Sequence, residues 1–350
     1  FYKSIKLAFI IVMILIANYS YAAMVTYDGV DYQYYSDGSA YTSQLSRDRK
    51  YSGDITVHGM IEVNDKIYTV VGVGSNTFSE CYELTGVSLP GTLTTIGYKA
   101  FLGCHDLSTE ISLPNVNLIG DFAFSGCKSI PSIKMGDNVT YIGNAAFNNC
   151  LSITEITIPK GVSTIGVQVF QSCESLKIVN LHNNIDTIGQ SAFCGCSALE
   201  TINIPISVKH IAKGVFSLCT SLKNINLPEG LQYIDERLFS QCESLETITL
   251  PESILYINER AFSMCSNLKS IVIPNKVNYI NNAVFSECSS LGKVYLGKNI
   301  STIGYSVFRN CTALKEIHIA NPIPPSVKID SQHGTTPFEG VDVANVNLYV

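Results

Sequence analysis

One interval of 23 residues dominates this 350-residue sequence. Eleven of its twelve cysteines stand 23 residues apart, from Cys81 to Cys311. Self-similarity at a fixed period over such a length is typical of a stacked repeat protein, in which each unit contacts only its neighbours. A column of identical residues, one in each repeat, is expected to be a layer of the core before it is a disulfide framework or a metal site.

Other residues keep fixed distances from the cysteine, which we number position 0. Position −3 is Phe in all eleven repeats, position +3 is Leu or Ile, and position −8 is Val or Ile. With a frequent Ala at position −4, these apolar positions follow the three-and-four spacing of one helix face. Position −7 is mostly Gly, with Asp235, Asn258 and Asn281 among the exceptions, and these residue types are common at helix starts. The pattern predicts a short helical turn from position −7 onward.

After position +3 the apolar period changes to two. The run Leu222-Lys223-Asn224-Ile225-Asn226-Leu227 has apolar residues at +3, +6 and +8, and the last two alternate as they do in a strand. Pro often follows, and because it cannot donate a ladder hydrogen bond it marks the end of the strand. Each unit is therefore predicted to be one short strand plus one short helical turn. The predicted fold class is an α/β solenoid with one parallel β-sheet, capped by β-hairpins at the N-terminus.

The repeated motifs Leu-x-x-Ile-x-Leu-Pro and Ile-Gly-x-x-Ala-Phe-x-x-Cys resemble the BspA-type bacterial leucine-rich repeat family. The resemblance covers residues 68–320. It implies a secreted or cell-surface protein, since some members are adhesins that bind host matrix proteins or other cells. It implies no particular ligand.

The chain divides into four expected segments. Residues 1–22 are predicted to be a secretory signal, because two lysines precede an unbroken apolar run and small residues follow it. An uncleaved membrane anchor is the alternative for this segment, and no later segment is expected to span a membrane. Residues 23–67 are predicted to form a β cap with hairpin turns at Asp28-Gly29 and Asn64-Asp65. About eleven repeats occupy residues 68–320, and residues 321–350 are predicted to start a truncated C-terminal cap.

The sequence offers little support for chemistry. The eleven aligned cysteines are expected to be buried thiols acting as small apolar side chains, and only Cys194, outside the column, is expected to be partly accessible. The four histidines within the repeats fall in four different columns, so neither a metal site nor a catalytic base with a partner is expected. We predict no enzymatic activity, no cofactor and no nucleic-acid partner, because the chain has no basic block and a net charge of −6.

The exposed face of the predicted sheet is the expected binding surface, because extended sheet faces are where solenoids contact partners. Positions +5 and +7 should point outward there. Candidate contacts are Asn180, Asn203, Asn224, Asn226, Thr247, Thr249, Lys293, Tyr295, Glu316 and His318. Position +4 alternates in charge from Lys177 to Lys269, which predicts ion pairs between neighbouring repeats.

We therefore expect a secreted or cell-surface protein that mediates protein–protein contact or adhesion. Its partner would be a protein or glycan ligand on a host or neighbouring cell. One alternative is a structural spacer or self-association scaffold. Another is the repeat region of a larger protein whose enzyme domain lies outside this sequence.

Overall fold

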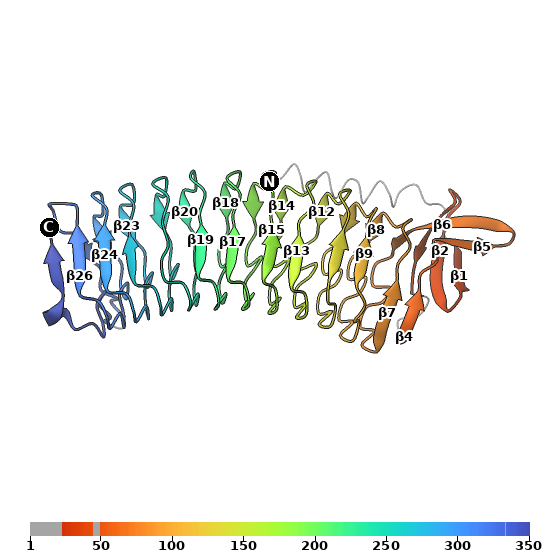
Figure 1. Cartoon of the computed structure of the whole chain (residues 1–350), viewed down its shortest axis with the longest axis horizontal. Coiled ribbons are helices and arrows are strands. Elements are labelled where there is room, and N and C mark those ends of the chain that lie inside the picture. The colour runs from red at the N-terminus through yellow and green to blue at the C-terminus, as the bar shows by residue number, and fades with distance from the viewer. Residues whose placement is uncertain (1–22, 45–49, 333) are drawn as a thin grey trace.

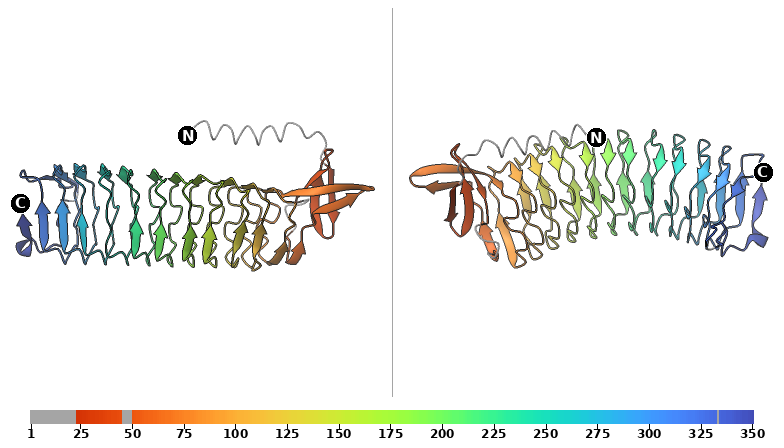
Figure 2. Two further views of the ribbon diagram at one scale, coloured as in Figure 1. Left: turned by 45° about the horizontal axis from the view of Figure 1, so that its top comes forward. Right: turned by 180° about the vertical axis from the view of Figure 1, so that it is seen from behind.

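The computed structural model describes residues 23–44, 50–332 and 334–350 as an elongated, gently curved rod (Figure 1). The predicted signal segment lies outside the described residues. The N-terminal strands occupy one end of the rod and the last strand the other, with one rung of chain after another stacked between them (Figure 2). Because each rung packs only on its neighbours, the core is a continuous column that runs the length of the rod.

Six strands precede the first full rung. They are β1 (Ala23–Tyr27), β2 (Val30–Tyr34), β3 (Ser39–Thr42), β4 (Gly53–Thr56), β5 (Met60–Val63) and β6 (Lys66–Val73). Antiparallel pairs join β1 to β2 and β5 to β6, around Asp28-Gly29 and Asn64-Asp65. Strand β4 belongs to neither pair, because it runs parallel to a strand of the first full rung. The β5–β6 pair extends beyond the end of the rod (Figure 1).

Each rung contributes to a first strand row at positions near +5 to +7. This row comprises β7 (Leu84–Ser88), β9 (Ile111–Leu113), β11 (Ile133–Met135), β13 (Glu155–Thr157), β15 (Ile178–Asn180), β17 (Thr201–Asn203), β19 (Asn224–Asn226), β22 (Ser270–Val272), β24 (Lys293–Leu296), β26 (Glu316–Ile319) and β28 (Asn347–Tyr349). Its pairings are parallel, as predicted. Residues 247–249 lie in the same place on their rung but are not in regular strand conformation.

A second strand row, at positions −9 and −8, corrects the prediction of one sheet. It comprises β8 (Thr95–Ile96), β10 (Leu118–Ile119), β12 (Tyr141–Ile142), β14 (Thr164–Ile165), β16 (Thr187–Ile188), β18 (His210–Ile211), β20 (Tyr233–Ile234), β21 (Tyr256–Ile257), β23 (Tyr279–Ile280), β25 (Thr302–Ile303) and β27 (Ser326–Val327). These two-residue strands also pair in parallel, and β6 continues the row at its N-terminal end. The rod therefore presents two strand faces.

The predicted helical turn is wrong. Among the described residues, the only helix is the short 3-10 helix η1 (Val343–Asn345). Every rung has two residues with positive φ, at positions −5 and −1, such as Lys99 (53°) and Gly103 (73°). Left-handed residues end a right-handed helix. The segment folds instead into successive turns, in which Cys104 N–H bonds the Phe101 carbonyl while Phe101 N–H bonds Ala123 on the next rung. Every second N–H group of the segment thus donates to the next rung. In a helix these N–H groups would donate within the same segment instead.

The phenylalanine column forms the centre of the core. Its eleven rings, from Phe78 to Phe308, are fully buried. Neighbouring rings stack with centroids 5.0 to 6.0 Å apart and planes within 21° of parallel. Tyr51 packs edge-on against the first ring, and Phe338 stacks on the last at 5.4 Å. Each buried ring contributes about 1.5–3 kcal/mol by transfer from water, so the column adds to the cohesion of every pair of neighbouring rungs.

The cysteine column lies beside it and explains the 23-residue interval. From Cys104 to Cys311, each thiol donates to the carbonyl of the phenylalanine 26 residues earlier, with sulfur–oxygen distances of 3.0 to 3.2 Å. All eleven cysteines of the column are buried and free. The expectation of small apolar core residues is therefore met, and the S–H group adds a bond between rungs.

One rung departs from the pattern. The strand at Ile111–Leu113 sits one residue late in its rung, and β9 pairs with β11 but is not hydrogen-bonded to β7 as a strand. The side chain of Thr109 instead accepts a bond from Val87 N–H. A shallow cavity of about 280 Å³ opens between the two rungs, lined by residues 87–89 and 110–112. The extra residue therefore interrupts the first strand row.

The left-handed backbone at position −1 can be tested by comparing the stabilities of Gly and Ala variants at two sites. The more stable variant should differ between a left-handed site and an ordinary one. Leu218 has φ of 62°, whereas Val167 has an ordinary φ, and the two are equally exposed at 40% and 39%. At position 218, the Gly variant should be more stable than the Ala variant by about 1 kcal/mol, because Gly avoids the left-handed strain. At position 167, Ala should be the more stable by about 0.5–1 kcal/mol, because Gly loses more backbone entropy. Urea unfolding of the four variants measures both differences, and the same order at both positions would contradict the assignment.

Candidate functional site

The candidate residues of the first strand row point away from the core. Isoleucine or valine at position +6 is buried in nine of the eleven rungs and partly buried as Ile248, so its neighbours at +5 and +7 face outward by strand alternation. Asn180, Asn203, Asn224, Asn226, Thr247, Thr249, Lys293 and Tyr295 are exposed, and Glu316 and His318 are partly buried. Parallel register places them in two straight columns. The ten residues share one surface, and ring stacking and ion pairs join the C-terminal four into one contact group.

The rings of that contact group belong to an aromatic ladder. Tyr295, His318 and Tyr349 are register partners on β24, β26 and β28. The Tyr295 and His318 rings stack with centroids 4.4 Å apart and planes 15° from parallel. The His318 and Tyr349 rings stack at 4.5 Å and 7°. These spacings are shorter than those of the buried phenylalanine column, and Tyr295 and Tyr349 remain 37% and 47% exposed.

Charged side chains flank the aromatic ladder in the +5 column. Lys293 Nζ lies 3.1 Å from Glu316 Oε1, and His318 Nε2 lies 3.2 Å from Glu316 Oε2. Hydrogen bonds from His318 and then Lys293 lower the pKa of the Glu316 carboxyl. The hydrogen bond between Lys293 and Glu316 in turn raises the pKa of the Lys293 ammonium group. Glu316 therefore connects the two columns and holds both neighbours in place.

The charge column at +4 forms separate pairs. Lys223 Nζ lies 2.8 Å from Glu200 Oε2, and Lys269 pairs with Glu246. Each lysine thus bonds the glutamate of the preceding rung. Exposed pairs of this kind contribute only about 0–1 kcal/mol each. The predicted ion pairs between neighbouring repeats are thus present for Lys223 and Lys269.

The twelve cysteines are free thiols, and the eleven of the column are buried. Burial raises the pKa of the Cys173, Cys265 and Cys311 thiols to about 12. Cys194 is half-buried, as expected for the residue out of step, and burial raises its pKa as well. Among the residues that the structure describes, no group of three or more His, Cys, Asp or Glu could hold a metal ion. No described helix is long and apolar enough to cross a membrane.

Sequence reasoning missed two parts of the surface. Tyr349 completes the aromatic ladder, but the interval from Phe338 to Tyr349 is one residue longer than that from Phe308 to His318, and no cysteine marks its rung. The second strand row was missed because two-residue strands are too short to show a period. The recurring Thr-Ile and Tyr-Ile pairs before the conserved turn were the available signal, since these residue types favour strands.

The stacked rungs, the apolar columns and the exposed strand faces define a leucine-rich repeat solenoid. The model for the BspA type leucine rich repeat region (6 copies) matches residues 107–223 and 186–315, which together cover more than half of the sequence. The chain therefore belongs to the BspA-type leucine-rich repeat family.

Solved bacterial proteins share the architecture. A leucine-rich cell surface protein from Faecalibacterium prausnitzii is 26% identical with a TM-score of 0.60, over 86% of this chain and 96% of that one. A leucine-rich repeat protein from Bacteroides ovatus is 26% identical with a TM-score of 0.56, over 84% of this chain and 94% of that one. No curated protein sequence matches the chain.

Acid titration should reveal the role of Glu316. Its pKa is lowered in the folded state, so its stabilising contribution is present above the ordinary glutamate pKa and is lost as the pH falls through the lowered value. At neutral pH, Glu316→Gln should be less stable than the unsubstituted protein, and below about pH 3 the difference should vanish. Urea midpoints measured from pH 2 to 7 test this, with Glu155→Gln as a control on the same column. A difference that persists at low pH would contradict it.

Thiol accessibility should separate Cys194 from the column. Ellman's reagent at pH 8 should label one thiol rapidly in the native protein and all twelve in urea, and Cys194→Ser should remove the rapid phase. Alkali should destabilise the fold, because the unfolded thiols ionise near pH 8.5 whereas Cys173, Cys265 and Cys311 hold their protons to about pH 12 in the folded protein. Stability should therefore fall as the pH rises above about 9. Several rapidly labelled thiols in native protein would refute the buried column.

Proposed function

We propose that the chain is a non-enzymatic, surface-exposed binding protein that contacts a protein partner through the C-terminal part of its first strand row. Family membership favours protein–protein interaction. Surface localisation is supported by the similarity to the cell surface protein from Faecalibacterium prausnitzii and by the signal-like residues 1–22. Adhesion to a host or neighbouring cell is the proposed role.

The observation that carries the proposal is the Tyr295–His318–Tyr349 ladder beside the Lys293–Glu316 pair. Aromatic residues are frequent anchors of protein interfaces. Rings already stacked on one another lose little conformational freedom when a partner binds, which lowers the cost of association. The adjacent charges add orientation, because Lys293 and Glu316 offer a donor and an acceptor on the same face.

The middle of the first strand row lacks the aromatic and charged side chains that the C-terminal part presents. Its exposed side chains from Asn180 to Thr249 are short amides and hydroxyls. Asn180 is already engaged, since its Nδ2 donates to Glu155 and Thr157. Small polar side chains are weak anchors, so we assign these residues to the solvated margin of the interface.

Binding to immobilised matrix proteins tests the function. Fibronectin, fibrinogen, laminin and collagen serve as probes in surface plasmon resonance with the secreted form of the chain. We expect at least one probe to bind. The triple variant Lys293→Ala, Tyr295→Ala, His318→Ala should weaken that binding by at least about tenfold, as loss of a central anchor does.

The matched control is Thr201→Ala with Asn203→Ala, which truncates the same columns on β17 and should leave affinity unchanged. Equal loss in both variants, or no loss in the triple variant, would contradict the assigned surface. Light scattering separates the alternative of a self-association scaffold, because a binding protein should remain a monomer as its concentration rises. Thermal unfolding of each variant checks that the rod is intact.

A further inference from the structure

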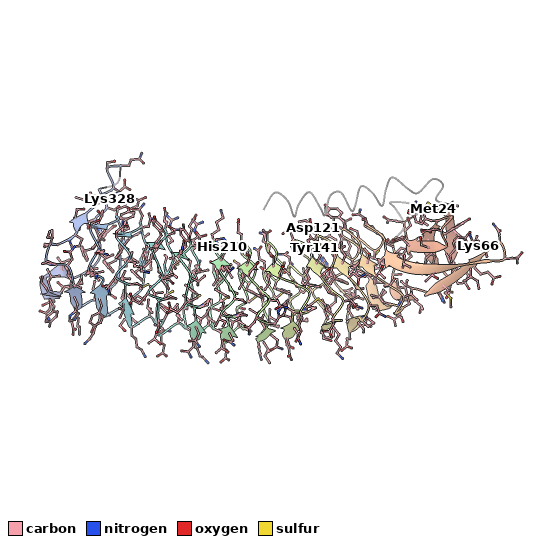
Figure 3. All side chains as sticks on the ribbon, turned by 90° about the horizontal axis from the view of Figure 1, so that it is seen from above. Met24, Lys66, Asp121, Tyr141, His210 and Lys328 are labelled. Carbon is pink, nitrogen blue, oxygen red and sulfur yellow. The ribbon has the colours of Figure 1, made fainter. Side chains whose placement is uncertain are left out.

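The second strand row carries its own aromatic column, on a different face from the ladder described above. Position −9 points outward on this row, and it is Tyr in β12, β20, β21 and β23. Figure 3 looks onto this face, where Tyr141 and His210 mark the row and Lys328 lies toward the C-terminal end. The partners proposed for the first strand row leave this face free.

Two of these tyrosines form an exposed stack. Tyr233 and Tyr256 are register partners, with ring centroids 5.3 Å apart and planes 11° from parallel. They are 43% and 47% exposed. The stacking covers one face of each ring and leaves both side chains partly exposed to solvent. The pair therefore offers a strip that combines polarised C–H edges with two hydroxyl groups.

Both arginines beside the stack are paired with a glutamate. Arg237 pairs with Glu236 at 3.2 Å and Arg260 with Glu259 at 3.4 Å. The Lys328 ammonium lies over the Tyr279 ring, 4.8 Å from its centroid. The Asp235 carboxylate on this face belongs to neither ion pair, so an acidic ligand is disfavoured, whereas an uncharged ligand with hydroxyl groups can donate to that carboxylate.

Planar polar groups border the tyrosines at position −7. Asn258 Nδ2 donates to Asp235 Oδ1 at 3.1 Å, and the same oxygen accepts the Glu236 N–H at 2.7 Å. Positions −9 and −7 are two residues apart in extended chain and so lie on one side of the strand. Asp235 is thus fixed with acceptor capacity to spare on the rung of Tyr233, and Asn258 and Asn281 add amide donors and acceptors on the next two rungs.

We propose that Tyr233, Tyr256, Asp235 and Asn258 form a second binding site, which takes an uncharged linear polysaccharide lying along the rod. The spacing of the rings is comparable to the length of one pyranose unit in an extended chain, so successive sugars meet successive rungs. Sugar hydroxyls supply the donors and acceptors that the phenol, amide and carboxylate groups require. The inference does not depend on the protein partner of the first strand row.

Affinity gel electrophoresis tests the proposal with a mixed-linkage β-glucan, a galactomannan and soluble starch as probes. At least one should retard the protein. Tyr233→Ala with Tyr256→Ala should weaken that retardation by at least about tenfold, the effect expected for a central aromatic contact. Tyr256→Phe keeps the stack and removes one hydroxyl, so it should give a smaller loss. Thermal unfolding confirms that each variant is folded.

Tyr141→Ala is the matched control. Tyr141 stands in the same column and is 44% exposed, but its register partner is Leu118 instead of another tyrosine. This variant and the first-row variant Tyr295→Ala should both retain polysaccharide binding. The proposal is overturned if no probe retards the protein, or if Tyr141→Ala loses as much as the double variant. It is also overturned if the double variant keeps its polysaccharide retardation and loses only the binding of a protein partner.

Discussion

The carbonyl of each column phenylalanine is where neighbouring rungs are joined. It accepts the N–H of the cysteine three residues later, which closes a turn within the rung, and from Phe78 to Phe285 it also accepts the S–H of a cysteine on the next rung. A buried carbonyl has two lone pairs to satisfy. Cysteine suits this position because it is small, apolar and still a donor. Alanine could fill the space but would leave the second lone pair without a partner.

This constraint determines what surrounds it. If the carbonyl serves two rungs, the turn must hold it at a fixed angle to the rod axis. The left-handed residues at positions −5 and −1 do so by turning the chain on either side of it. The phenylalanine ring then points inward in every rung, and the rings stack because their backbones repeat. The two strand rows lie on either side of this turn segment along the chain, so the exposed faces inherit their regularity from it.

The sequence was sufficient to predict the repeat, its core columns and the strand at positions +5 to +7. It was insufficient for the segment between −8 and +3, because spacings of three and four residues arise equally from a helix and from successive turns. A helix and successive turns differ in whether every second N–H group donates within the segment or to the next rung, which the spacing does not reveal. Nor do residues such as Lys99, Phe122 and Arg260 give a local sign of the left-handed backbone that they adopt. Of the aromatic ladder, Tyr295 and His318 were predictable from their column. Tyr349 was not, because its rung lacks the cysteine that sets the count.

The corner at position −1 has a consequence for how such a chain can diversify. Its backbone is fixed by bonds to the neighbouring rung, while its side chain is never buried. Gly, Ser, Asn, Glu, Gln, Leu and Met all occupy it along this one molecule, with φ between 56° and 76° throughout. The corner is thus a row of display positions about 5 Å apart, where surface chemistry can change one rung at a time while the rod keeps its shape.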